Sequence, residues 1–160
     1  MSRTGWDDPW LRLFDAPAVE DARLEALRDE ATRASATLFV WSPPARARRD
    51  ADTTQRVVGV VPTPDPADAL AAVGVAGPHH GIGLPAIVRF VVTLRSFARF
   101  AIEEMGEDRL VLALRANDAT SLARIAERVR HLCPPLAKRT SAEAIARDLD
   151  TSGRLVLDWA

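Results

Sequence analysis

The residues of this chain best suited to chemistry lie in one glycine-rich segment, GPHHGIGLP, at positions 77–85. His79 and His80 stand side by side between glycines, and a helix is predicted to begin just beyond them. Backbone amides at a helix N-terminus attract anions, and histidine titrates near neutral pH. Both histidines, with Gly81 and Gly83, are therefore candidate ligand-binding residues for an anion or a nucleotide.

The same segment also fits a glycine-rich surface turn that leads into a helix, which is the interpretation we favour. Gly81, Gly83 and Ala86 have the G-x-G-x-x-A spacing of a dinucleotide-binding turn, but such a turn directly follows a strand, and residues 77–80 stand there instead. Adjacent residues seldom ligate one ion together, and His131 is the only other histidine. We expect no metal and no cofactor.

Two other groupings could support chemistry. Cys133 follows His131 by two residues, and an imidazole can activate a thiol, but a position between an amphipathic helix and two prolines favours buried packing. Glu103 and Glu104, with the acids at 107–108, could do acid–base work, but they flank a predicted tight turn and we expect them to be solvated. The sequence has no P-loop, G-x-S-x-G, H-E-x-x-H or paired C-x-x-C motif, so we expect a protein that is not an enzyme, without excluding one.

Hydropathy periodicity predicts an α+β or α/β fold that would position these residues. We expect a sheet of about four or five strands with helices packed against it. Strands are predicted at 36–41, at 56–61, in two stretches that end at 116, and at 154–160, and helices at 19–35, 66–73, 85–100, 118–132 and 141–149. We expect a single domain over 1–160, with an apolar segment and helix over 1–35, an α/β body over 36–160 and a mobile loop over 42–55.

Local signals set the predicted boundaries. Asp15 with Pro17 predicts the start of the first helix. A wide apolar stripe predicts a central helix over 85–100, packed against the sheet. Thr140 and Glu143 have the spacing of a capping box for the last helix.

Composition argues against several classes of function. The 160 residues are 48% hydrophobic and 27% charged, as in ordinary globular proteins. The net charge of −1 gives no overall attraction for nucleic acid, and the arginines of the 46–49 stretch are followed at once by aspartates, so nucleic-acid binding is not expected. Three arginines interrupt the most hydrophobic window, and each would cost about 2.5–3.5 kcal/mol at the centre of a membrane. With no signal-peptide pattern at the start, we expect a cytoplasmic protein without a membrane partner.

Apolar side chains are concentrated in the first fifteen residues. A solvated tail would not expose as much apolar surface as Trp6, Trp10 and Phe14 provide. We therefore expect this segment to pack on the body of the protein or on a partner. These three residues are our candidates for binding a protein partner or a second copy of the chain.

A series of short segments runs through the second half of the chain. These are DALAAVGVAGP (68–78), TLRSFARF (93–100), DRLVLALRA (108–116), CPP (133–135), SAEAIARDL (141–149) and a closing strand with tryptophan. In these segments, over roughly residues 68–160, the chain resembles an uncharacterised bacterial family, the domain-of-unknown-function 4253 family. Phe97 and Ala98 stand where the family tends to have a Trp-Glu pair. The resemblance implies a compact α/β domain without assigned chemistry, and it transfers no active site.

Together these features predict a non-catalytic protein-interaction or accessory module, of which an immunity-type protein would be one form. The alternative is a small-molecule or nucleotide-binding protein, or an enzyme, that uses the Gly77–Gly83 loop.

Overall fold

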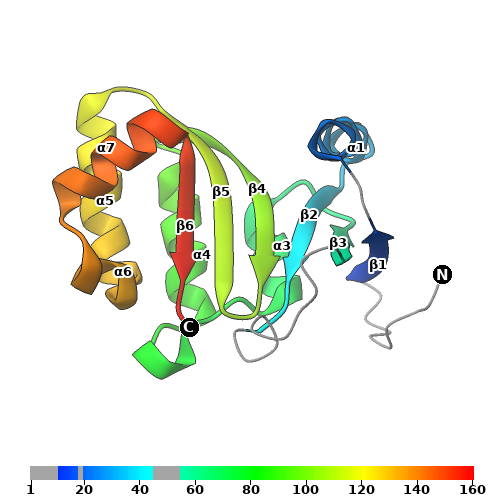
Figure 1. The fold of residues 1–160 in the computed structure, drawn as a ribbon, viewed down its shortest axis with the longest axis horizontal. Helices are drawn as coiled ribbons and strands as arrows, with labels where there is room; N and C mark the ends of the chain where they lie inside the picture. The colour runs from blue at the N-terminus through cyan, green and yellow to red at the C-terminus, as the bar shows by residue number, and fades with distance from the viewer. Residues whose placement is uncertain (1–10, 18–19, 45–54) are drawn as a thin grey trace.

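The computed structural model describes residues 11–17, 20–44 and 55–160, which form helices around one mixed sheet (Figure 1). The strands are β1 (Arg12–Pro17), β2 (Thr37–Ser42), β3 (Gln55–Val61), β4 (Ala98–Gly106), β5 (Arg109–Ala116) and β6 (Arg154–Asp158). The helices are α1 (Asp21–Arg33), α3 (Pro66–Val73), α4 (Leu84–Leu94), α5 (Ala119–Leu132), α6 (Pro134–Arg139) and α7 (Ala142–Ser152), with a 3₁₀ turn, η1 (Pro78–His80). The predicted α+β class is confirmed, with six strands in this sheet rather than four or five.

The sheet, ordered β1-β3-β2-β4-β5-β6, consists of two antiparallel halves joined by a short parallel ladder. The halves meet where β2 runs parallel to β4, over three residue pairs that end with Ser42 beside Gly106. A Cβ atom on Gly106 would lie 2.1 Å from the carbonyl oxygen of Ser42. The two halves can therefore come together only because residue 106 has no side chain.

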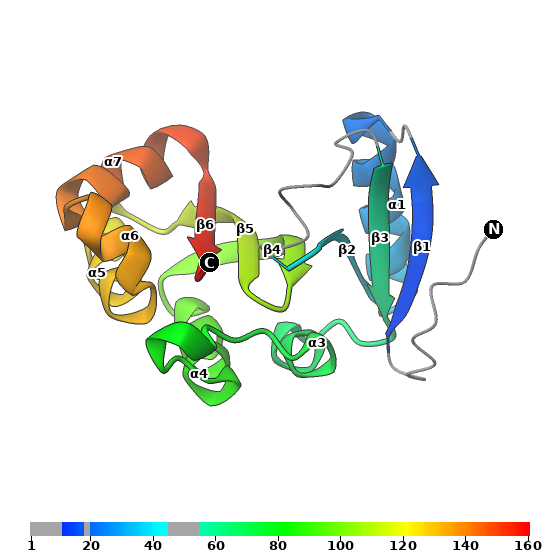
Figure 2. The same ribbon diagram turned by 60° about the horizontal axis from the view of Figure 1, so that its bottom comes forward.

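The helices cover the two faces of the sheet unequally (Figure 2). Helices α3 to α7 contribute to the main core on one face, together with inward-facing strand residues such as Phe39 and Leu112. Helix α1 lies on the opposite face, where its buried Leu24 and Val40 of β2 line one cleft. In the described part of the chain, no helix covers the outer face of β4, β5 and β6 (Figures 1 and 2).

The structure moves two predicted boundaries. Asp15 and Pro17 lie in β1, and the first helix begins only at Asp21. β1 is an edge strand, where the missing N–H of a proline is tolerated.

The helix predicted over 85–100 ends at Leu94, where the amide of Phe97 donates to the Leu94 carbonyl. From Ala98 onward, alternate residues face the core, which is the period of a strand and not of a helix. Ala98 therefore begins β4.

Side chains cap three of the helices within the described ranges, α3, α5 and α7. Asp65 accepts from the amide of Ala67, and Asp118 accepts from the amide of Ser121, which lowers the pKa of Asp118. The last helix is capped by Ser141, which accepts from the amide of Ala144, and not by Thr140 as its spacing with Glu143 predicted. None of the helices within the described ranges is both long and apolar enough to cross a membrane.

Candidate functional site

In the Gly77–Gly83 loop, packing and backbone geometry account for two of the glycines. Gly77 and Ile82 exchange backbone hydrogen bonds of 2.7 and 3.0 Å, which close the loop around η1. A Cβ on Gly77 would lie 2.6 Å from the buried ring of Trp159, and Gly81 has the positive φ of 69° that favours glycine. The need for glycine is thus explained by packing against Trp159 at position 77 and by backbone conformation at position 81.

The two candidate histidines lie in η1, where His79 is exposed and His80 is half-buried. Gly83, the residue before α4, offers no side-chain cap to that helix. Among the described residues, no three His, Cys, Asp or Glu side chains are grouped so that they could hold a metal ion. Ligand binding at His79, His80, Gly81 and Gly83 stays a prediction.

Cys133 packs in the core, as its position after an amphipathic helix predicted. It is fully buried, and its thiol donates a 3.4 Å hydrogen bond to the carbonyl oxygen of Asp158. Burial raises the pKa of the Cys133 thiol. His131 is exposed on α5. The thiol therefore stays protonated near neutral pH and is not a nucleophile.

Of the candidate partner-binding residues, Trp6 and Trp10 lie outside the described residues, as does the arginine stretch at 46–49. Phe14 lies on β1 and has 38% of its surface exposed. It pairs in register with Val58 of β3.

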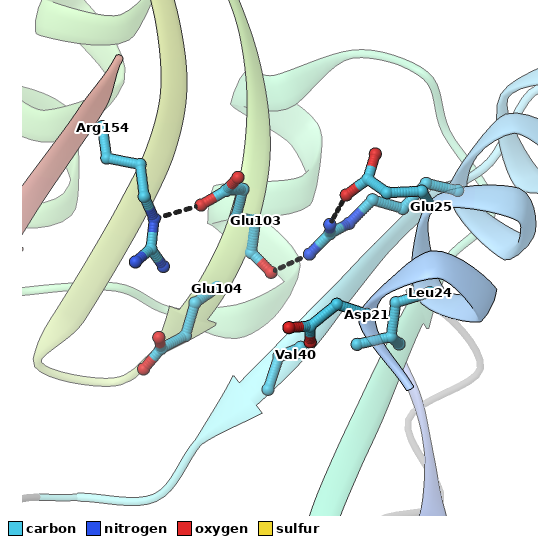
Figure 3. Close-up of a pocket in the computed structure, with 8 residues that line it drawn as sticks. Asp21, Leu24, Glu25, Val40, Glu103, Glu104 and Arg154 are labelled. Atoms are coloured by element: carbon cyan, nitrogen blue, oxygen red, sulfur yellow. Dashed lines mark hydrogen bonds and ion pairs between the residues drawn. The ribbon is translucent and has the colours of Figure 1, made fainter. Parts of the chain in front are cut away.

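A bulge in β4 brings Glu103 and Glu104 to the same face of the sheet. Ile102 pairs with Leu112 and Glu104 pairs with Val111, which leaves Glu103 as the extra residue. Both glutamates line one cleft between α1 and the open face of the sheet (Figure 3). Their side chains are only 23% and 22% exposed, so the expectation that they are solvated was wrong.

Arginines neutralise both glutamates. Arg154 donates to Glu103 at 2.6 Å (Figure 3). Arg109 donates to Glu104 at 2.7 Å and to Asp158 at 2.6 Å. Burial alone would lower the pKa of Arg109, but the two carboxylates outweigh burial and raise it. These ion pairs tie β4, β5 and β6 together on the uncovered face.

Helix α1 is held over the same cleft by Arg28, which pairs with Glu25 and donates a 2.8 Å hydrogen bond to the carbonyl oxygen of Glu103. The cleft has a volume of about 330 Å³. Its charged lining consists of Asp21, Glu25, Arg28, Glu103, Glu104 and Arg154. Because the glutamates of the sheet are already bound to arginines, the cleft holds elements together and offers no free acid–base pair.

A second concave surface runs along α5, in part between α5 and α4, which pack against one another, and in part between α5 and Phe97, beyond the end of α4. It consists of two hollows, of about 330 and 550 Å³, that share Arg128, and we call both together the α4–α5 groove. The first is lined by Ile82, Ala86, Arg89, Phe90, Thr93, Arg128, His131 and Leu132. The second is lined by Phe97, Thr120, Ala123, Arg124, Glu127 and Arg128.

The groove carries more positive than negative charge, with three arginines against one carboxylate, Glu127. Arg89, Arg124 and Arg128 are exposed, and none of the three forms an ion pair with a carboxylate in the described part of the chain. Arg124 and Arg128 instead lie over the ring of Phe97, 5.8 and 5.5 Å from its centroid. The sequence analysis missed the groove, because it depends on the packing of α4 against α5.

Comparison of the chain with known protein families, with curated proteins and with solved structures finds no significant match. The resemblance to the domain-of-unknown-function 4253 family stays a prediction.

Proposed function

We propose that this protein is a non-catalytic interaction domain that binds a partner protein through the α4–α5 groove. The observation that carries the proposal is that the groove combines an apolar lining with exposed arginines that form no ion pair with a carboxylate of the described residues. A protein interface needs both, because the apolar centre supplies most of the affinity and the arginines give orientation and specificity.

The contrast with the cleft under α1 supports this choice of surface. In that cleft the glutamates are bound to Arg154 and Arg109, and Arg28 is bound to Glu25 and to the backbone of β4. A ligand there would have to break existing ion pairs. In the α4–α5 groove, no carboxylate of the described residues forms an ion pair with Arg89, Arg124 or Arg128, so a ligand would not have to break such a pair.

Site-directed photo-crosslinking tests the proposal. A photoreactive amino acid is placed at Thr93, inside the groove, and in a separate protein at Arg115, on the open face of the sheet. In cells that produce the protein, the Thr93 probe is expected to give a discrete crosslinked product, and the Arg115 probe is not.

The captured protein is then purified and its affinity is measured by calorimetry. Replacing Arg89 and Arg128 with alanine should weaken binding at least about tenfold, or about 1.4 kcal/mol. The matched control replaces Arg99 and Arg115, which pair in register on β4 and β5, and should leave the affinity unchanged. Equal crosslinking from both probes, or equal loss in both variants, would show that the groove is not the interface.

A further inference from the structure

We infer that the partner presents to the α4–α5 groove an acidic segment that carries a large apolar side chain. This inference rests on the proposed function and names the chemistry of the partner.

The charge of the groove favours a carboxylate-bearing partner. Its lining includes Arg89, Arg124 and Arg128 against one carboxylate, Glu127, although the whole chain carries a net charge of −1. Guanidinium groups bind carboxylates through paired, charge-assisted hydrogen bonds, which are stronger than neutral ones. The groove therefore carries a local excess of positive charge, although the chain as a whole is slightly negative.

The arginines over Phe97 are held in place before any partner binds. The two guanidinium groups lie 5.8 and 5.5 Å from the ring centroid, within the range of a cation–π contact. Such a contact restricts the arginine rotamers, so a partner has less side-chain entropy to remove on binding. Arg124 and Arg128 are one helical turn apart on α5, and they present a paired site for carboxylates on one face of that helix.

The apolar part of the groove is positioned beside this charge. The first hollow is lined by the apolar side chains of Ile82, Ala86, Phe90 and Leu132 together with Arg89 and Arg128. Removing the exposed part of such a lining from water requires an apolar side chain from the partner. A segment that carries carboxylates and one large apolar residue would match this lining.

The same features argue for a protein segment over nucleic acid. Nucleic-acid sites present many cations along a phosphate backbone, often with aromatic rings free to stack on bases. Here Phe97 is already covered by Arg124 and Arg128, so its ring is not free to stack on a base.

Fluorescence anisotropy with defined peptides tests the inference on the full chain. The probe is a fluorescein-labelled peptide in which Glu alternates with Leu, and the matched peptides carry Gln in place of Glu, or Ser in place of Leu. The Glu–Leu peptide should bind, and each matched peptide should bind at least about tenfold more weakly. Arg124→Ala combined with Arg128→Ala should weaken binding of the Glu–Leu peptide to a similar degree. Arg89→Ala should also weaken this binding, without disturbing Phe97. Arg99→Ala with Arg115→Ala should leave the binding unchanged.

Four results would overturn the inference. The first two are that the Glu–Leu peptide does not bind, or that the Gln peptide binds equally well. The third is that the Arg99 and Arg115 control loses as much affinity for the Glu–Leu peptide as the Arg124 and Arg128 variant. The fourth is that a DNA duplex displaces the peptide at a lower concentration than unlabelled peptide does. Self-association that disappears in the Arg124 and Arg128 variant would assign the groove to a second copy instead. If crosslinking from Thr93 captures a protein but the acidic peptide does not bind, the proposed function stands and the acidic chemistry is wrong. If neither occurs, both are wrong.

Discussion

Replacing Gly106 with alanine should weaken the joint between the two halves of the sheet. The added Cβ would lie 2.1 Å from the Ser42 carbonyl oxygen, whereas real Cβ atoms keep at least 3.0 Å from such an atom. The obstacle is backbone, so β2 and β4 must separate at this end of their ladder. Overpacking of this kind costs about 1–3 kcal/mol, and each ladder hydrogen bond that is stretched or lost adds about 0.5–1.5 kcal/mol.

Together these terms predict a loss of about 2–5 kcal/mol in the free energy of unfolding, which for a chain of this size lowers Tm by roughly 5–15 °C. Thermal and guanidinium unfolding followed by circular dichroism would measure it. Gly83→Ala is the matched control, because its Cβ meets only Pro85 Cδ at 3.5 Å and its φ of −90° suits any residue. If Gly106→Ala is no more destabilising than Gly83→Ala, the close approach of β2 to β4 is not as described.

Three further predictions concern single interactions. Ser141→Ala should destabilise the protein by about 1 kcal/mol in chemical denaturation, because α7 loses its N-terminal cap. Thr140→Ala should change the stability by less than about 0.5 kcal/mol. The reverse order of these two effects would place the cap at Thr140. Arg109→Met should lower the free energy of unfolding by about 1–3 kcal/mol, because it removes the cation that the half-buried carboxylates of Glu104 and Asp158 share. Arg99→Met, on the same face of the sheet, should leave the free energy of unfolding nearly unchanged. Equal effects of the two substitutions would refute a specific role for Arg109. Burial raises the pKa of Cys133, so the unfolded chain loses the thiol proton at lower pH than the folded protein does, and the free energy of unfolding should fall above the ordinary pKa of a thiol. Urea unfolding at a series of pH values should show this decline in the wild type relative to Cys133→Ala. Parallel curves for the two proteins would contradict the prediction.

Elements whose boundaries depend on local chemistry could be predicted from the sequence. Helix α3 was placed correctly at both ends, because Asp65 caps it, Pro66 suits its first position, and Gly74 ends it with a positive φ of 74°. Helix α5 follows its apolar period from Asp118 to Leu132 in the same way. Such signals act within one turn of the chain, so they do not depend on the rest of the fold.

Features that depend on contacts distant in sequence could not be predicted. The segment RLFDAP becomes β1 because it pairs with β3, although Asp15 and Pro17 indicate a helix start when taken alone. The arginines of α4 and α5 meet at one groove only through the packing of two helices that are separated by two strands in the chain. Likewise, Glu103 and Glu104 gave no sign that arginines from β5 and β6 would lie against them.

The bulge in β4 also determines how this strand can change length. Before it the core-facing residues are at even positions, such as Ala98 and Ile102, and after it the buried Met105 is at an odd one. The extra residue therefore reverses which positions face the core. Deleting Glu103 would leave both flanking registers intact, whereas a deletion elsewhere in β4 would turn part of the strand inside out. This is the one place in β4 where the chain could lose a residue and keep its pattern of buried and exposed side chains.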